Sequence, residues 1–455
     1  MADFSNYLSP GRKGHLIGIG GVSMSSLAEV LKGMGINVSG SDTNDSANVK
    51  ALRQLGIEIS IGHCAENIGA DVEFVVRTAA VHDDNPEVMW AKWQGIPVFE
   101  RTEAWGAISQ DYANALCISG THGKTTTTSM CTHILMAADR DPTVMIGGTL
   151  PLLNAGHRVG HGNTIVMEAC EYYNSFLSFH PTVAVILNIE ADHLDFFKDL
   201  EDVEKSFRHF AERVPSDGYV VANHDDKNTM ETLHGIDKKL VTFGLTPGAD
   251  VYAENIRYIG ASSEFDIMYK GKRFTDVTLH VPGQHNVKNA LAATAAAICL
   301  GIRPNAVKYG LAGFNGAGRR FEFKGKFNGA DVYDDYAHHP GELKVLLDTV
   351  EKLNYKRTVL VFQPHTYTRT AALFEDFVEQ LKRPDVLLLA EIFAAREKNT
   401  VGISSSSLSE RIDGSGFLPS FGQLEEELRR IACPGDIILT VGAGDVYKIG
   451  ENLVR

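Results

Sequence analysis

The chain is organised around Cys117-Ile118-Ser119-Gly120-Thr121-His122-Gly123-Lys124-Thr125-Thr126-Thr127-Thr128. A short apolar run, residues 115–118, leads into the glycines, and a helix-compatible stretch follows them. In a strand–glycine loop–helix arrangement, backbone N–H groups and the helix N-terminus can hold phosphate. Lys124 would then reach the outer phosphates of a nucleotide, and the Thr125 hydroxyl would bind Mg²⁺. Because Ile118 stands where the full pattern has glycine, a Gly/Thr-rich turn with an exposed lysine remains the alternative.

The composition is that of a globular protein with several domains. A length of 455 residues suggests about three of them. The net charge of −14 and the lack of any Lys/Arg cluster argue against nucleic acid as the main partner. Neither a ~20-residue apolar run nor a signal peptide is present, so we expect a cytoplasmic protein without integral membrane association. The six scattered cysteines form no C-x-x-C pair, which argues against a disulfide framework or a zinc site.

The first segment, residues 1–108, has the outline of a nucleotide-binding α/β unit. Residues 15–21 predict a strand that runs into a glycine turn, with Ser23 as the cap of the following helix. A second strand, 38–40, leads to Asp42, which stands about where a ribose-binding acid belongs. Ser23 replaces the third glycine of G-x-G-x-x-G. Three interpretations therefore stay open: a UDP-type ligand, NAD, or a tight turn without a ligand.

Acidic and imidazole side chains follow two predicted strands of the middle segment, residues 109–316. Glu168 ends the strand at 164–167, and Asp192 and His193 follow the strand at 183–187. Ligands gather at the carboxyl ends of parallel strands, so all three side chains are expected to face Lys124. Mg²⁺ prefers carboxylate and hydroxyl oxygens, whereas imidazole is an unusual ligand for it. The alternatives are a solvated strand end for Glu168 and a surface histidine for His193.

The middle segment ends in an added β region and a long helix. Strand-like runs between about 219 and 280 predict the β region, and residues 282–290 open an alanine-rich helix to Leu300. Asn286 and Asn289 lie three residues apart and hence on one face of that helix. Their carboxamides can either cap the helix or contact an adenine edge, and the sequence leaves both possibilities open.

The last segment, residues 317–455, predicts a second open parallel sheet. Gly316 and Gly318 precede paired arginines, which indicates a hinge and a domain boundary. Four strand-like runs alternate with helical stretches at 331–333, 358–362, 386–389 and 437–440. Polar clusters follow three of these runs, at 334–340, 363–369 and 442–445. A second group of functional side chains is therefore expected at the edge of this sheet.

Five motifs in this order resemble those of the Mur ligase family, and the resemblance covers essentially the whole chain. They are residues 15–25, 120–127, 188–195, 334–340 and 363–369. The resemblance implies an α/β fold with three domains. These are an N-terminal Rossmann-like UDP-substrate domain (1–108), a central P-loop ATPase-type parallel sheet with an added β region (109–316), and a C-terminal Rossmann-like domain (317–455).

The same resemblance implies an ATP- and Mg²⁺-dependent ligase. It would join L-alanine to the lactyl carboxylate of UDP-N-acetylmuramate through an acyl phosphate, in the peptidoglycan synthesis on which cell shape and cell division depend. A monomer or weak homodimer is expected. The competing hypotheses are a related ligase that adds another amino acid or a preformed peptide, or acts on folate; an NAD-dependent dehydrogenase; and a nucleotide-binding regulatory protein without turnover.

The resemblance also implies roles for individual residues, each at a position that matches a family motif. The implied ATP-binding residues are Gly120, Thr121, His122, Gly123, Lys124, Thr125, Thr126, Asn286, Asn289, Arg320 and Asp335. The implied metal ligands are Thr125 and Glu168 for one Mg²⁺ and His193 for a second. The implied catalytic residues are Lys124, Glu168, His193, Arg320, Asp335, His338, His365 and Arg369, the last three positioning the acyl phosphate and the amino acid. The implied UDP-substrate residues are Gly18, Gly20, Gly21, Ser23, Met24, Asp42 and His63.

Three positions depart from the more familiar family pattern. Cys170 and Asn174 stand where acidic residues are usual, while Glu168 and Glu171 are in place. Ala337 replaces a glycine, which we expect to be harmless.

Overall fold

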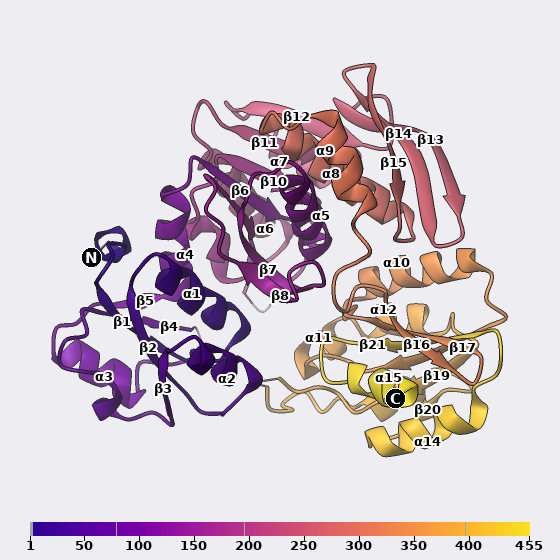
Figure 1. The fold of residues 1–455 in the computed structure, drawn as a ribbon. Helices are drawn as coiled ribbons and strands as arrows, with labels where there is room; N and C mark the ends of the chain where they lie inside the picture. The colour runs from indigo at the N-terminus through magenta and orange to yellow at the C-terminus, as the bar shows by residue number, and fades with distance from the viewer. Residues whose placement is uncertain (1–2, 79, 195, 396) are drawn as a thin grey trace. The chain divides into compact units, whose positions relative to one another are not determined.

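The computed structural model describes residues 3–78, 80–194, 196–395 and 397–455 (Figure 1). The chain forms two compact units. The first comprises Met1–Arg257, Ser263–His280 and Asn286–Asn315, and the second comprises Tyr258–Ser262, Val281–His285 and Gly316–Arg455. Asp195, which belongs to the predicted motif at 188–195, lies outside the described residues. No helix in the described ranges has the length and apolar character needed to span a membrane.

The first sheet has five parallel strands in the order β3-β2-β1-β4-β5. Its strands are β1 (Lys13–Ile17), β2 (Asn37–Asp42), β3 (Glu58–Ile61), β4 (Phe74–Arg77) and β5 (Val98–Glu100). Its helices are η1 (Phe4–Tyr7), α1 (Val22–Gly33), α2 (Ala47–Gln54), η2 (Ala65–Asn67), α3 (Pro86–Trp93) and α4 (Arg101–Gln110). The prediction that Ser23 caps α1 is wrong, because the helix begins at Val22 and Gly21 is its N-cap.

The second sheet has ten strands in the order β15-β14-β13-β12-β11-β10-β6-β9-β7-β8. The strands are β6 (Asn114–Ser119), β7 (Thr143–Leu150), β8 (Ala155–Arg158), β9 (Thr164–Glu168), β10 (Val183–Ile186), β11 (Tyr219–Asn223), β12 (Lys239–Gly244), β13 (Val251–Ile259), β14 (Ser262–Tyr269) and β15 (Lys272–Leu279). The helices are α5 (Lys124–Ala137), η3 (Tyr172–Ser178), α6 (Leu200–Glu212), α7 (Lys227–Thr232), α8 (Gln284–Cys299) and α9 (Pro304–Ala312). The parallel centre and the added β region at β13–β15 confirm the predicted fold class.

The third sheet has six strands in the order β16-β17-β21-β18-β19-β20. Its strands are β16 (Glu322–Phe327), β17 (Ala330–Asp335), β18 (Arg357–Phe362), β19 (Val386–Leu389), β20 (Gly416–Phe417) and β21 (Asp436–Val441). Its helices are α10 (Pro340–Val350), η4 (Glu351–Leu353), α11 (Tyr367–Ala372), α12 (Phe374–Leu381), α13 (Ser405–Ser409), α14 (Phe421–Ile431) and α15 (Tyr447–Val454). The four predicted runs lie in β17, β18, β19 and β21, which pair in parallel as expected, and the structure adds β16, which pairs antiparallel to β17 at one edge.

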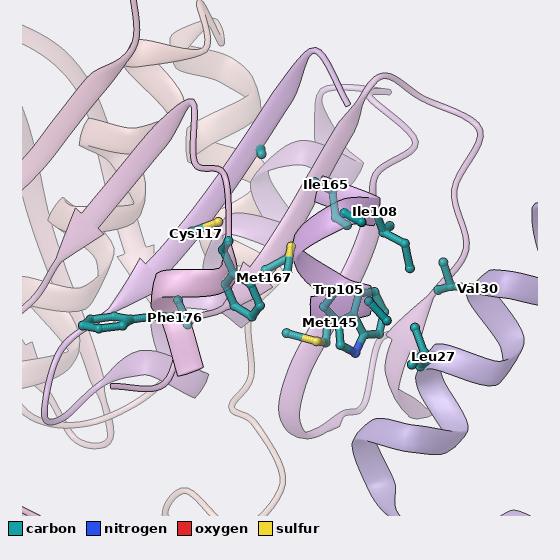
Figure 2. Packing of buried hydrophobic residues seen from close by; sticks show 14 of the residues in the cluster. Leu27, Val30, Trp105, Ile108, Cys117, Met145, Ile165, Met167 and Phe176 are labelled. Atoms are coloured by element: carbon teal, nitrogen blue, oxygen red, sulfur yellow. The ribbon is translucent and has the colours of Figure 1, made fainter. Parts of the chain in front are cut away.

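The first two sheets share one hydrophobic core. Figure 2 shows Leu27 and Val30 of α1 and Trp105 and Ile108 of α4 beside Met145 and Ile165 of the second sheet. Trp105 is only 1% exposed, and burial of one such large apolar side chain contributes roughly 1.5–3 kcal/mol. The two sheets therefore belong to one folded unit. The predicted boundaries at 108/109 and 316/317 stay predictions.

Candidate functional site

The loop between β6 and α5 has a backbone that only glycine fits. Gly120 has a φ of 141° and Gly123 a φ of 85°. A Cβ on Gly120 would lie 2.8 Å from the Leu187 Cβ, and one on Gly123 would lie 2.8 Å from the Asn289 Oδ1. Both the conformation and the lack of space exclude larger residues. The loop therefore packs closely against Leu187 and Asn289, and this packing fixes its backbone.

Asn188, directly after β10, holds this loop in place. His122 donates its backbone N–H to Asn188 Oδ1 at 2.7 Å, and Asn188 Nδ2 donates to the His122 carbonyl at 3.1 Å. Thr121 donates its N–H to the Asn188 carbonyl at 3.1 Å. Thr121 also accepts the Glu190 N–H at its hydroxyl, at 2.9 Å. Sequence reasoning missed Asn188, although its place at a strand end is the signal that drew attention to Glu168.

Helix α5 begins at Lys124 and contains all four consecutive threonines. The first turn of a helix leaves N–H groups without an intrahelical partner, which suits an anionic ligand. Threonine is a poor helix former, but Thr128 donates its hydroxyl to the Lys124 carbonyl at 2.8 Å, and the four threonines, residues 125–128, are all buried. Packing and side-chain bonds thus override propensity here, and the helix points its N-terminus at the glycine loop.

Lys124 is paired with Glu171. Its ammonium donates to both Glu171 oxygens, at 3.1 and 3.0 Å, and to the carbonyls of Gly120 and Thr121. Burial lowers the pKa of Lys124, but the charge of Glu171 and its hydrogen bond to the ammonium raise that pKa to a net value above the ordinary one. Lys124 therefore carries its positive charge throughout the physiological pH range, directly beside the loop.

Thr125 and Glu168 meet as the sequence predicts. The Thr125 hydroxyl donates to Glu168 Oε1 at 3.1 Å, and Gly147 donates its N–H to Glu168 Oε2 at 2.7 Å. A hydroxyl and a carboxylate in contact are hard oxygen donors, and Mg²⁺ commonly takes one or two such groups and completes its shell with phosphate and water. Among the residues that the structure describes, no three His, Cys, Asp or Glu side chains form a metal cluster. The pair fits a nucleotide-bound Mg²⁺.

His193 lies in the loop after β10. Its ring stacks on Tyr172 with centroids 4.2 Å apart, and its Nε2 is 3.8 Å from Asp192 Oδ2. The residue has a positive φ of 54°, which is uncommon outside glycine. This geometry orients the imidazole, while its role as a ligand of a second ion stays a prediction.

Asn286 and Asn289 are both buried near the start of α8. Asn289 donates to Asn286 Oδ1 at 3.3 Å, and its own Oδ1 approaches the backbone of Gly123. The pair therefore lies beside the glycine loop. Contact with adenine remains a prediction.

The glycine turn after β1 is the predicted UDP-binding loop, and the structure shows its backbone geometry. Gly20 donates its N–H to Asp42 Oδ2 at 2.9 Å, and Gly18 has a φ of 79°. Gly21 caps α1, so the helix N-terminus faces this loop. Met24 is only 1% exposed and packs in the core, and its N–H donates to the Gly21 carbonyl at 3.0 Å, so a role in substrate binding stays a prediction. His63 follows β3 at the same edge of the sheet.

Asp335 and Arg320 lie together in the second unit. Asp335 accepts the N–H groups of Phe321 and Ala337, each at 2.8 Å. The Arg320 guanidinium lies 5.2 Å from the ring centre of Tyr336. The sequence did not indicate the pair beneath them, in which Arg319 donates to the fully buried Asp334 at 2.9 Å.

The imidazoles of the second unit also cluster. The rings of His338 and His365 are 5.6 Å apart, and Arg369 Nη1 is 3.4 Å from His365 Nδ1. Burial, with the charges of His338 and Arg369, lowers the pKa of His365 to about 4. Thr366 has φ 66° and ψ 146°, a region that almost only glycine adopts. This strain beside His365 is invisible in the sequence.

Asp335→Asn is expected to change the pH dependence of stability. Burial raises the pKa of Asp335 to about 6, against the opposing effect of Arg320. In the folded state the carboxyl of Asp335 thus holds its proton more tightly than in the unfolded state, where its pKa is near the ordinary 3.8. The free energy of unfolding therefore falls as the pH rises from 3.8 to about 6, and it does not change further above that range. The variant should lack this fall. Melting temperatures at pH 4.5 and 7.5 test this prediction. The melting temperature of the variant, relative to that of the wild type, should be higher at pH 7.5 than at pH 4.5. An equal difference between the two proteins at both pH values would contradict the prediction.

Comparison with known proteins gives matches along the whole chain. The sequence model of the Mur ligase family, catalytic domain, matches residues 13–113; that of the Mur ligase middle domain matches 118–297; and that of the Mur ligase, glutamate ligase domain, matches 319–444. UDP-N-acetylmuramate–L-alanine ligases of Clostridium novyi and Agathobacter rectalis are each 46% identical, over 98% and 97% of this chain and 97% of each relative. The crystal structure of UDP-N-acetylmuramate-alanine ligase MurC from Thermotoga maritima is 29% identical with a TM-score of 0.81, covering 97% of this chain and 98% of that one.

Proposed function

Because the chain belongs to the Mur ligase family, we propose that it joins L-alanine to the lactyl carboxylate of UDP-N-acetylmuramate in an ATP-dependent step of peptidoglycan synthesis. The observation that carries this function is the 46% identity, across 98% of the chain, to a ligase named for the reaction. The protein is thus an amide-bond-forming ligase. This excludes the hypotheses of an NAD-dependent dehydrogenase and of a regulatory protein without turnover.

The reaction needs an activated carboxylate. A free carboxylate does not react with an amine at neutral pH, because its oxygen is a poor leaving group. Transfer of the ATP γ-phosphoryl group to the lactyl oxygen would give an acyl phosphate and ADP. The amine of L-alanine would then attack the acyl carbon and release phosphate. Lys124, held charged at the glycine loop by Glu171, would stabilise the negative charge that develops on the phosphoryl oxygens during the transfer.

The remaining residues would bind and orient the reactants. Thr125 and Glu168 would hold a Mg²⁺ ion, which supplies further positive charge to the phosphates when bound. Asn286 and Asn289 would contact the adenine. The loop around Gly20 would bind the UDP diphosphate through its N–H groups and the α1 N-terminus. His338, His365 and Arg369 would position the acyl phosphate and the amino acid, and Arg320 and Asp335 the nucleotide.

An amino-acid panel tests the proposed function. Purified protein with ATP and Mg²⁺ should release phosphate only when UDP-N-acetylmuramate and L-alanine are both present, and mass spectrometry should detect the product with one alanine added. Glycine, L-serine, D-glutamate and a preformed tripeptide serve as competing acceptors. Release with the tripeptide alone would reassign the chain to the peptide-adding ligases.

Location and assembly are further parts of the proposal. We place the enzyme in the cytoplasm, because the reaction consumes ATP, and we expect a monomer or a weak homodimer. Sedimentation velocity over a range of protein concentrations measures the second point; a stable tetramer would contradict it.

A further inference from the structure

We propose that Glu87 is a positioning residue that fixes the tautomer of His63, so that His63 Nε2 accepts the N3–H of the uracil base. The inference rests on the proposed function in one respect, namely that the UDP group binds at the carboxyl edge of the first sheet. It adds a physical basis for selecting uracil over cytosine.

Glu87 is the centre of a buried polar cluster. The residue lies on α3 and is 0% exposed. Ser41 of β2 donates its hydroxyl to Glu87 Oε2 at 2.7 Å, and Asn67 of η2 donates to Glu87 Oε1. His63 Nδ1 is 3.0 Å from Glu87 Oε2, and His15 Nε2 of β1 is 3.8 Å from Glu87 Oε1. One carboxylate thus joins α3 to two strands, η2 and the loop that carries His63.

The hydrogen bonds around Glu87 determine which nitrogen of His63 carries the proton. Burial raises the pKa of Glu87, but the nearby His15 and the hydrogen bonds from Ser41 and Asn67 bring it to a net value below the ordinary one. The carboxyl is therefore ionised at neutral pH and can only accept hydrogen bonds. Ser41 gives its single hydrogen to Glu87, so the Ser41 oxygen, 3.1 Å from His63 Nδ1, also acts as an acceptor there. Both neighbours of Nδ1 are acceptors, and Nδ1 must be the donor.

A neutral imidazole with its proton on Nδ1 offers a lone pair at Nε2. Nδ1 faces two groups that are fully buried, whereas the His63 side chain as a whole is 17% exposed. The opposite edge of the ring, which carries Nε2, is therefore the part that solvent or a ligand can reach. The buried hydrogen bond that Nδ1 donates thus leaves Nε2 of His63 as a hydrogen-bond acceptor at the surface.

This acceptor lies on the same edge as the diphosphate loop. Gly62, next to His63, donates its N–H to the Asp42 carbonyl at 2.8 Å. The Asp42 side chain in turn accepts the N–H of Gly20, within the glycine turn. His63 is therefore linked to the turn through a single residue. A nucleotide whose diphosphate binds the turn can place its base near His63.

The acceptor at Nε2 distinguishes uracil from cytosine. Uracil carries a hydrogen on N3, between two carbonyl groups, and can donate it to Nε2. Cytosine has a lone pair on N3, which would face the lone pair on Nε2. Since a buried polar group without a partner is penalised, we expect a preference for UDP over CDP of about tenfold or more.

Glu87→Gln tests the role of the carboxylate. The glutamine amide can donate to Nδ1, which would move the proton of His63 to Nε2. Calorimetry with UDP and CDP on the full chain should then show the UDP/CDP affinity ratio falling by about tenfold, and ¹⁵N NMR of the His63 ring should show the change of tautomer. In the enzyme assay, KM for UDP-N-acetylmuramate should rise while kcat stays within about twofold.

Two further variants separate positioning from folding. Ser39→Ala removes a 3.0 Å contact to His15 Nδ1 on the same sheet and should leave the UDP/CDP ratio unchanged. In a His63→Ala background, Glu87→Gln should have no further effect on the ratio. A folded Glu87→Gln protein with an unchanged ratio, or an equal effect of Glu87→Gln without His63, would overturn the inference. Should Glu87→Gln fail to fold, His63→Ala alone must still reduce the ratio. A wild type that does not use UDP-N-acetylmuramate would refute the proposed function instead.

Discussion

Lys124→Ala is expected to lower turnover by about 10³-fold or more, because the ammonium is the charged group of the loop that would stabilise the transferring phosphoryl group. The loop proposed to bind UDP belongs to another sheet, so the affinity for UDP-N-acetylmuramate should stay within about twofold of the wild type. Single-turnover phosphate release and calorimetry measure the two effects. Lost affinity for the UDP substrate in a folded variant would contradict the assignment of separate sites.

The buried partner of Lys124 supplies a control for this experiment. Glu171 is only 2% exposed, and its charge would remain without Lys124. Breaking such a buried pair on one side typically costs about 3–5 kcal/mol, so the single variant should also melt earlier. Lys124→Met combined with Glu171→Gln removes both charges and should recover most of this stability without recovering turnover. Recovery of turnover by the double variant would show that lost stability, and not lost charge, had caused the defect.

Glu168→Gln is expected to give the second largest effect, because it replaces a carboxylate in contact with Thr125. We expect turnover about 100-fold lower and a Mg²⁺ requirement about tenfold or more higher. The fold should survive, since the glutamine carbonyl can still accept the Gly147 N–H and its amide can donate to the Thr125 hydroxyl. A Mg²⁺ titration of phosphate release measures both quantities.

A carboxylate remote from the glycine loop serves as the matched control. Glu212 on α6 pairs with Arg208 at 3.1 Å in an exposed ion pair. Glu212→Gln removes a charge of the same kind and should leave the Mg²⁺ titration unchanged. If Glu168→Gln gave the same titration curve as Glu212→Gln, the assignment of Glu168 as a metal ligand would be wrong.

The parts of the site that depend on local sequence could be predicted. The glycine loop follows from glycines between an apolar run and a helix, and Glu168 follows from the rule that parallel strands end at one edge. Even the contact between Thr125 and Glu168, which are 43 residues apart, was within reach, because both follow neighbouring strands of one sheet. Residues at the ends of parallel strands can thus be predicted to meet even when they are far apart in the sequence.

Other features depend on contacts for which the sequence holds no such rule. The cap of α1 falls on Gly21 because its backbone, and not the Ser23 hydroxyl, fits the turn. Strand β16, which pairs antiparallel to β17, was not predicted, because its sequence alternates phenylalanine with charged residues and glycine and contains no apolar run. Glu87 lies on a helix and bonds to groups from three other elements, so neither periodicity nor a motif could indicate it.

The core that α1 and α4 share with the second sheet limits how this ligase can be recombined with its relatives. A chimera joined at residue 108 would have to match Leu27, Val30 and Trp105 from one parent with Met145 and Ile165 from another. Mismatched volumes at such a seam create voids or clashes of the kind that cost several kcal/mol. Exchange of substrate specificity between relatives would therefore succeed more readily when both sheets are transplanted as a single cassette.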